Sequence, residues 1–167
     1  DQNMEEAAYC MEQATDRCKM YCGEKNQMYS ALSEELARMY NAAGRREESL
    51  ACHLAVRNQL LKNGYREGSM LLMVDNNMSV VYLDLGRPEE AIPYLTEALE
   101  LTKENGLVGS AVAEPTWNLA RVYRALGDEE KEDIYLKAAV EGFRECYPPE
   151  HPKRIAAEQR LKERQGE

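Results

Sequence analysis

The chain has 167 residues, a length typical of one domain or of a short array of repeats. Its 30 acidic and 21 basic residues give a net charge of −9, which argues against nucleic acid as a partner because phosphate binding needs clustered cations. The same acidity argues against a polybasic membrane-binding patch, and the longest clean apolar run, residues 70–74, is far too short to span a bilayer. We therefore expect a protein that binds neither nucleic acid nor membranes.

The cysteine content bears on the compartment. Five cysteines are an odd number at a low density, which is not typical of a disulfide-stapled secreted domain. We therefore expect reduced thiols and a cytoplasmic location. The chain begins at Asp1 with neither an initiator methionine nor an apolar signal segment, and we expect it to be part of a longer chain.

Six of the ten glycines recur at intervals of 20 to 22 residues: Gly23, Gly44, Gly64, Gly86, Gly106 and Gly127. A glycine just past the end of a helix closes that helix in the left-handed conformation. The spacing therefore predicts a row of helices of about five turns each, joined by short turns. The turns alternate between two sequence types, which indicates that the repeating unit is a helix pair of about 42 residues.

The expected elements follow in chain order within one repeat domain spanning 1–167. We expect eight helices: the second helix of a truncated repeat at 4–22, helix pairs at 26–63, 67–105 and 110–147, and a C-terminal capping helix at 152–165. Pro88 is expected at the first position of a helix, where proline is favoured. Asp128 is expected as the N-cap of a helix, a position that aspartate favours. Lys162 stands where the earlier repeats have a small close-contact residue, so we expect no further repeat to pack on the last helix.

The expected helices are amphipathic. In the second pair, Met78, Val81, Tyr82 and Leu85 follow the i, i+3, i+4, i+7 spacing of one helix face. The other pairs repeat this stripe, with a tyrosine four residues before the glycine each time. No strand-like alternation competes with it, so the sequence predicts an all-α fold.

The second expected repeat has a small residue and an aromatic on its first helix, then glycine, then two alanines seven residues apart on its second: Ser79, Tyr82, Gly86, Ala91 and Ala98. This pattern resembles that of the tetratricopeptide repeat family. The long period and the segment Tyr147-Pro-Pro-Glu-His-Pro152 resemble the 42-residue repeats of kinesin light chains. Some alanines are replaced in the neighbouring repeats, for example by Ser49 and Glu132. The resemblance implies a right-handed superhelix of antiparallel helix pairs, an α-solenoid, whose concave groove binds peptides.

Positions in that groove are carried over by their distance from each turn glycine. The residues expected to bind a peptide are Arg38, Asn41, Asn76, Asn77, Val80, Asp84, Trp117, Asn118, Arg121 and Arg124. Further groove-facing positions are Glu34, Glu35, Met73, Glu114, Gln159 and Arg160.

Two groups among these residues favour peptide binding. For each group the sequence also allows a purely structural role. Trp117, Arg121 and Arg124 share one helix face, where guanidinium groups could hold an acidic or C-terminal segment. Alternatively, Trp117 packs on a neighbouring helix and the arginines pair with local acids. Asn77 and Asn118 could bond a peptide backbone, as the resemblance implies, or could instead bond an adjacent helix.

No metal, cofactor or catalytic site is expected. Cys18 and Cys22 lie one helical turn apart, but a closed zinc site needs four ligands, and neither His53 nor His151 is near them in sequence. We interpret the thiols as packed, His53 as adjacent to the core, and His151 as structural. No phosphate loop or catalytic set stands out, so we do not expect an enzyme.

The sequence predicts a non-catalytic scaffold that binds a peptide or helical segment of a partner protein in its concave groove. The alternative is a peptide-sensing regulatory domain of a larger bacterial regulator. We expect a monomer, or a weak dimer formed through the exposed half-repeat at 4–22, and concentration-dependent sedimentation would distinguish the two.

Overall fold

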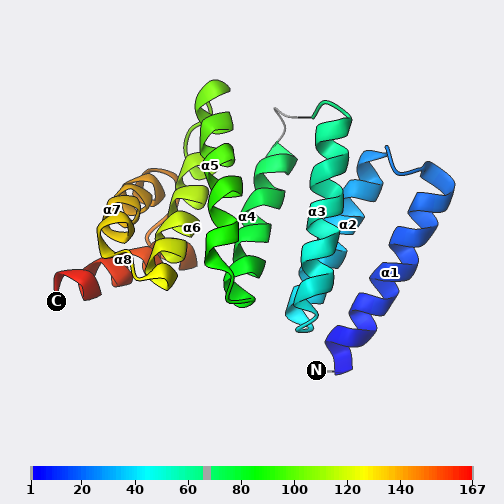
Figure 1. Ribbon diagram of the computed structural model, residues 1–167, viewed down its shortest axis with the longest axis horizontal. Helices are drawn as coiled ribbons and strands as arrows, with labels where there is room; N and C mark the ends of the chain where they lie inside the picture. Colours follow the sequence, from blue (N-terminus) through cyan, green and yellow to red (C-terminus); the bar gives the residue numbers. More distant parts are fainter. Residues whose placement is uncertain (1, 66–68, 167) are drawn as a thin grey trace. The chain divides into compact units, whose positions relative to one another are not determined.

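The computed structural model describes residues 2–65 and 69–166, and these residues form eight α-helices and no strand (Figure 1). The helices are α1 (Gln2–Cys22), α2 (Gln27–Ala42), α3 (Arg46–Lys62), α4 (Ser69–Asp84), α5 (Pro88–Glu104), α6 (Ser110–Leu126), α7 (Glu129–Cys146) and α8 (Pro152–Gln165). The all-helical fold with eight helices is thus confirmed. None of these helices has the length and apolar character that crossing a bilayer requires.

The turn glycines end the helices as the sequence predicts. All six have positive φ, from 62° at Gly106 to 83° at Gly44. After α2, Gly44 N–H donates to Asn41 O at 3.0 Å and Arg45 N–H donates to Tyr40 O at 2.8 Å, which satisfies carbonyls that the helix end leaves unpaired.

Two helix starts also follow the sequence prediction. Pro88 is the first residue of α5. Asp128 caps α7, where its carboxylate accepts a hydrogen bond from Lys131 N–H at 3.1 Å.

The chain divides into two compact units, Asp1–Leu85 and Gly86–Glu167. The boundary falls within the repeat expected at 67–105, whose first two residues lie outside the described residues. The assignment of the four repeats and of a single repeat domain stays a prediction.

In the first unit, α1 to α4 lie side by side in chain order (Figure 1). Ala8, Leu36 and Tyr40 form a buried cluster between α1 and α2. The Tyr40 hydroxyl donates to Glu12 Oε1 at 2.8 Å, so the aromatic ring is buried while its polar end is satisfied. Burial and this bond raise the pKa of Tyr40 above its usual value.

An ion pair joins α3 to α4 inside the first unit. Arg57 Nε donates to Asp75 Oδ1 at 2.7 Å, and Asp75 is fully buried. Removing either partner would leave an uncompensated buried charge, so the pair has to stay intact for α3 and α4 to pack as they do.

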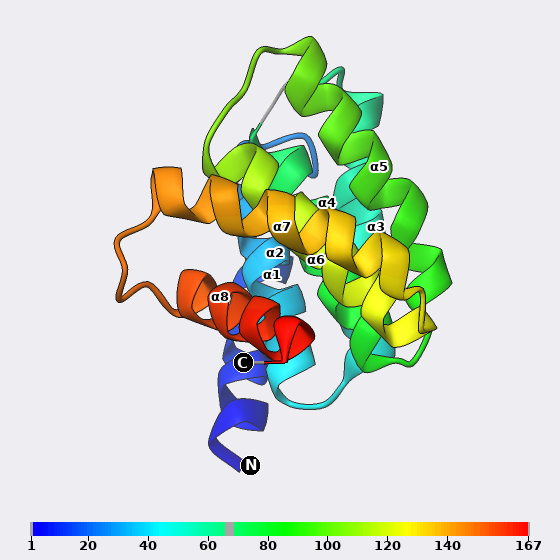
Figure 2. The same ribbon diagram turned by 90° about the vertical axis from the view of Figure 1, so that its left-hand side faces the viewer.

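In the second unit, a buried apolar cluster joins α6, α7 and α8: Ala113, Ala120, Leu136, Val140, Phe143 and Ala157. Figure 2 shows α8 lying along α7. Ala157 is the buried residue of α8, whereas Lys162 is exposed, as we expected for a capping helix.

Candidate functional site

Helices α2 and α4 border a hollow of about 190 Å³ in the first unit, called here the α2–α4 hollow. Four of the residues that the sequence predicts for peptide binding line it: Arg38, Asn41, Asn77 and Val80. His53 and Val81 complete its lining among the described residues. Arg38 and Asn41 are three residues apart on α2, as are Asn77 and Val80 on α4, so each pair shares one helix face.

Two polar side chains of α2 give the hollow its hydrogen-bonding character. Asn41 Nδ2 donates to Asp84 Oδ2 at 3.2 Å, which links α2 to α4. Asn41 Oδ1 is buried and accepts no hydrogen bond from any described residue. Arg38 is exposed and pairs with Glu35, one turn earlier in the same helix. The hollow therefore offers an acceptor that lacks a donor and a guanidinium held only by a surface ion pair.

Two of the lining residues belong to a buried polar network. Glu34 Oε1 lies 2.8 Å from His53 Nδ1, and Glu34 Oε2 accepts a hydrogen bond from Asn77 Nδ2 at 3.3 Å. Glu34 is 3% exposed and His53 1% exposed. The expectation that Glu34 faces the groove is therefore wrong, because its carboxylate turns inward to these two partners. His53 is buried, as we expected, but its carboxylate partner was not predicted.

The remaining two predicted residues of α4 lie outside the lining of the hollow. Asn76 is half-buried and donates from Nδ2 to Leu72 O at 3.0 Å, within its own helix. Asp84 is exposed and accepts the hydrogen bond from Asn41. The structure thus brings together four of the six predicted residues of this unit around one hollow.

In the second unit, Trp117 packs on α7. Its ring meets that of Phe143 edge to face, with centroids 6.4 Å apart, and its side chain is half-buried. The gap beside Trp117, Arg121 and Arg124 has a volume of only about 10 Å³, too small to enclose a ligand. Any partner at this place therefore has to bind on an open surface.

The polar residues of α6 differ in exposure. Asn118 is 7% exposed, and its Oδ1 accepts a hydrogen bond from Arg121 Nη1 at 3.3 Å. Arg124 is exposed in the last turn of the helix. Of the two guanidinium groups, that of Arg124 is the more available to a partner.

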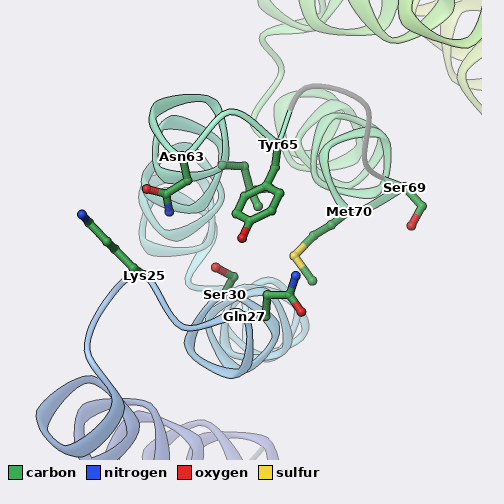
Figure 3. A pocket seen from close by; sticks show the side chains of 8 residues that line it. Lys25, Gln27, Ser30, Asn63, Tyr65, Ser69 and Met70 are labelled. Atoms are coloured by element: carbon green, nitrogen blue, oxygen red, sulfur yellow. The ribbon is translucent and has the colours of Figure 1, made fainter. Parts of the chain in front are cut away.

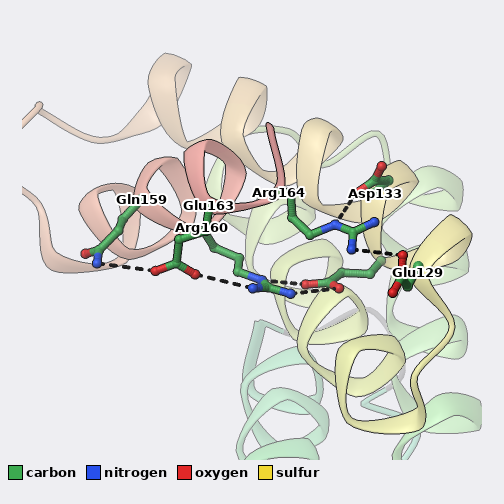
Figure 4. Close-up of polar contacts among 7 residues, drawn as sticks. Glu129, Asp133, Gln159, Arg160, Glu163 and Arg164 are labelled. Carbon is green, nitrogen blue, oxygen red and sulfur yellow. Dashed lines mark hydrogen bonds and ion pairs between the residues drawn. The ribbon is translucent and has the colours of Figure 1, made fainter. Parts of the chain in front are cut away.

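Helix α8 is attached to α7 by ion pairs that the sequence analysis missed (Figure 4). Arg160 holds Glu132 with two hydrogen bonds, Nε to Oε1 at 2.7 Å and Nη2 to Oε2 at 3.1 Å. These bonds raise the pKa of Arg160 above its usual value. Arg164 pairs with Asp133 at 2.8 Å and with Glu129 at 3.2 Å. Arg160 was expected in the groove, and the replacement of an alanine by Glu132 was the one signal that could have indicated this pair.

The part of the chain that the structure describes holds no group of three or more His, Cys, Asp or Glu side chains able to share a metal ion. All five cysteines are free thiols. Burial raises the pKa of the Cys52 thiol to about 11, so this cysteine is a poor nucleophile at neutral pH.

Comparisons with known proteins agree with this fold. The tetratricopeptide repeat family model matches residues 70–145. A protein of Podosopora anserina described as a kinesin light chain with nearly identical TPR-like repeats superposes with a TM-score of 0.80 at 23% identity, over 99% of this chain and 81% of that one. BtubC (BKLC) from P. vanneervenii superposes with a TM-score of 0.78 at 18% identity, over 98% and 74% of the two chains. No curated protein matches the sequence.

The family match covers α4 almost completely, all of α5 and α6, and nearly all of α7. The solved structures extend the likeness in fold to almost the whole chain. Such repeats generally mediate protein–protein interaction through the surfaces that their stacked helices form. Residues 70–145 thus match the tetratricopeptide repeat family model, and almost the whole chain has the fold of kinesin light chain-like repeats.

Proposed function

We propose that the chain is a non-catalytic interaction module that binds a peptide or helical segment of a partner protein on the first helices of its repeats. The observation that carries this proposal is the α2–α4 hollow. Its volume of about 190 Å³ is below the range usual for cofactor and drug-sized ligands and is suited to a single inserted side chain. An extended segment of a partner can supply that side chain while its backbone lies across the rim.

The lining of the hollow defines the chemistry of the partner. Asn41 Oδ1, which has no donor among the described residues, can accept a hydrogen bond from a peptide N–H. Val80 and Val81 offer apolar contact to the inserted side chain. Arg38 can exchange its exposed pair with Glu35 for a carboxylate of the partner. We therefore infer a partner segment that places an apolar side chain next to an acidic one.

Helix α6 supports a second set of contacts with the same preference. Arg124 is exposed there, and Trp117 is half-buried beside it. A guanidinium next to an indole is a frequent composition of protein-binding surfaces. Acidic residues of a partner protein are the expected counterparts.

Site-specific photo-cross-linking tests this proposal. A benzophenone amino acid replaces Arg38, which borders the hollow, or Asn58, an exposed residue of α3 that serves as the matched control. In extract of the source cells, position 38 is expected to cross-link to a discrete partner, and position 58 is not. Equal cross-linking from both positions would place binding elsewhere on the chain.

The cross-linked partner also distinguishes the two readings of the sequence. A segment within a larger protein supports a scaffold, which is the function proposed here. A short free peptide supports the peptide-sensing regulatory domain instead. In both cases mass spectrometry of the adduct gives the sequence of the bound segment.

A further inference from the structure

A second concave site lies where α2 and α4 begin and α3 ends (Figure 3). It has a volume of about 240 Å³ and is called here the helix-end pocket. Its lining combines polar side chains with two apolar ones: Lys25, Gln27, Ser30, Leu60, Asn63, Tyr65, Ser69 and Met70. It shares no lining residue with the α2–α4 hollow, and the sequence analysis gave no sign of it.

Ser30 is the residue that marks the pocket as a binding site. It is only 4% exposed, and its hydroxyl makes no hydrogen bond to any described residue. In Figure 3 this hydroxyl points into the pocket, towards the side of Tyr65. This hydroxyl is therefore available to a ligand in the pocket, to which it can donate a hydrogen bond.

The electrostatics of the pocket favour an anion. Helices α2 and α4, of 16 residues each, begin at its edge and direct the positive ends of their dipoles towards it. The carbonyls at the end of α3 are already engaged, since Leu60 O accepts from Tyr65 N–H at 2.9 Å and Leu61 O accepts from Gly64 N–H at 3.1 Å. Lys25 stands at the rim, and no described residue of the lining carries a carboxylate. The Asn26 side chain already accepts from Met28 N–H at the start of α2, so the Lys25 ammonium and the Ser30 and Tyr65 hydroxyls are the groups of the described lining that can meet an anion.

The apolar part of the lining limits the rest of the ligand. Leu60 is 5% exposed, and the thioether of Met70 turns into the pocket in Figure 3. Together they can contact a short apolar body. A single lysine with neutral donors suits a monoanion better than a phosphate dianion, which usually requires several cations.

We propose that the helix-end pocket binds a small carboxylate with a short apolar body. The carboxylate accepts hydrogen bonds from the Ser30 and Tyr65 hydroxyls and pairs with Lys25 after that side chain turns inward. The apolar body lies against Leu60 and Met70. Both free carboxylic acids and the C-terminal residue of a peptide have this chemistry.

Titrations of the full ¹⁵N-labelled chain, followed by NMR, test the proposal. The probes are 4-methylpentanoate, its neutral amide 4-methylpentanamide, and N-acetyl-leucine. We expect saturable shifts at the amides of Ser30 and Asn63 with the acid, and a dissociation constant about tenfold higher for the amide. Tighter binding of N-acetyl-leucine than of 4-methylpentanoate assigns the site to a peptide C-terminus, and the reverse order assigns it to a free acid.

Two variants separate binding from folding. Lys25→Gln is expected to raise the dissociation constant of the acid about fivefold, whereas Lys62→Gln, a nearby lysine outside the lining, should change it less than twofold. Ser30→Ala should weaken binding by a similar factor and leave the urea midpoint unchanged, because the hydroxyl has no structural partner. Equal binding of acid and amide, or equal effects of the two lysine variants, would overturn the proposal.

Discussion

Glu34 is a carboxylate inside a helical stack, and its position depends on partners from two other helices. It is 3% exposed, contacts His53 at 2.8 Å, and accepts a hydrogen bond from Asn77. We expect Glu34→Ala to lower the free energy of unfolding by about 2–4 kcal/mol, because His53 and Asn77 lose their acceptor in a buried site. Urea denaturation followed by circular dichroism measures this loss.

The neighbouring residue provides a matched control for that variant. Among the described residues Glu35 pairs only with the exposed Arg38, so Glu35→Ala should cost less than about 0.5 kcal/mol. If the two alanine variants were equally stable, the network around Glu34 would have no role in holding α2, α3 and α4 together.

The pKa values of two half-buried groups, the Tyr147 hydroxyl and the Cys52 thiol, determine how we expect the free energy of unfolding to depend on pH. Burial, with a hydrogen bond to Glu114, raises the pKa of Tyr147 to about 12, and burial raises the pKa of Cys52 to about 11. The unfolded chain loses these protons nearer pH 10 and 9, so stability is complete below about pH 9 and falls as the pH rises towards 12. Urea midpoints at pH 8 and pH 10.5 should therefore differ in the parent protein.

The double variant Cys52→Ala/Tyr147→Phe isolates that effect. It lacks both protons, so its midpoint should fall less between the two pH values than the midpoint of the parent. An equal fall in both proteins would show that other groups cause the alkaline loss.

At the scale of the elements, the contact between α6 and α7 depends on a glycine. A Cβ atom added to Gly142 would lie 2.9 Å from Ala113 Cβ, which is closer than real Cβ contacts allow. Gly142→Ala should therefore destabilise the protein by about 1–3 kcal/mol, although alanine is the better helix former by about 1 kcal/mol. Thermal and urea unfolding measure the net change.

The reciprocal substitution controls for helix propensity. In Ala113→Gly/Gly142→Ala the two side chains are exchanged and the contact is relieved, so this double variant should be more stable than Gly142→Ala alone. A Gly142→Ala protein more stable than the parent would contradict the close approach of the two helices.

The attachment of α8 to α7 has a buried ion pair at its centre. Glu132 is 3% exposed and accepts two hydrogen bonds from Arg160. Glu132→Ala should cost about 1–3 kcal/mol, because a partly buried guanidinium loses its bidentate partner. The more exposed pair of Asp133 with Arg164 is the comparison, and Asp133→Ala should cost less than about 1 kcal/mol. Hydrogen exchange in α8 should rise in the first variant more than in the second, and equal rises would refute the distinction.

The helices were predictable from the sequence because the residues that end and start them lie within a few positions of each helix end. A glycine such as Gly44 must take positive φ at a helix end, and that requirement appears in the sequence as a regular spacing. The replaced alanine marks Glu132 in the sequence, but its partner Arg160 was not predictable, because 28 residues separate the two and only the packing of α8 brings them together.

At the scale of the whole molecule, the all-helical repeat fold was predictable from the repeated spacing, whereas the candidate site was predictable only in part. The register picked out Arg38, Asn41, Asn77 and Val80, which lie around one hollow, and their role in binding stays a prediction. The register cannot show the direction of a side chain, which is why the burial of Glu34 was missed. The helix-end pocket was missed as well, since its lining comes from three helix ends that have no shared motif.

The central claim is that a partner segment binds at the α2–α4 hollow. The most direct test is the affinity of the cross-linked segment, made as a synthetic peptide, for the parent and for two variants of equal charge. Val80→Asp alters the lining of the hollow, and Ala51→Asp alters an exposed position on α3. The account predicts a dissociation constant at least about tenfold higher for Val80→Asp and unchanged for Ala51→Asp. Equal affinity of all three folded proteins would contradict it.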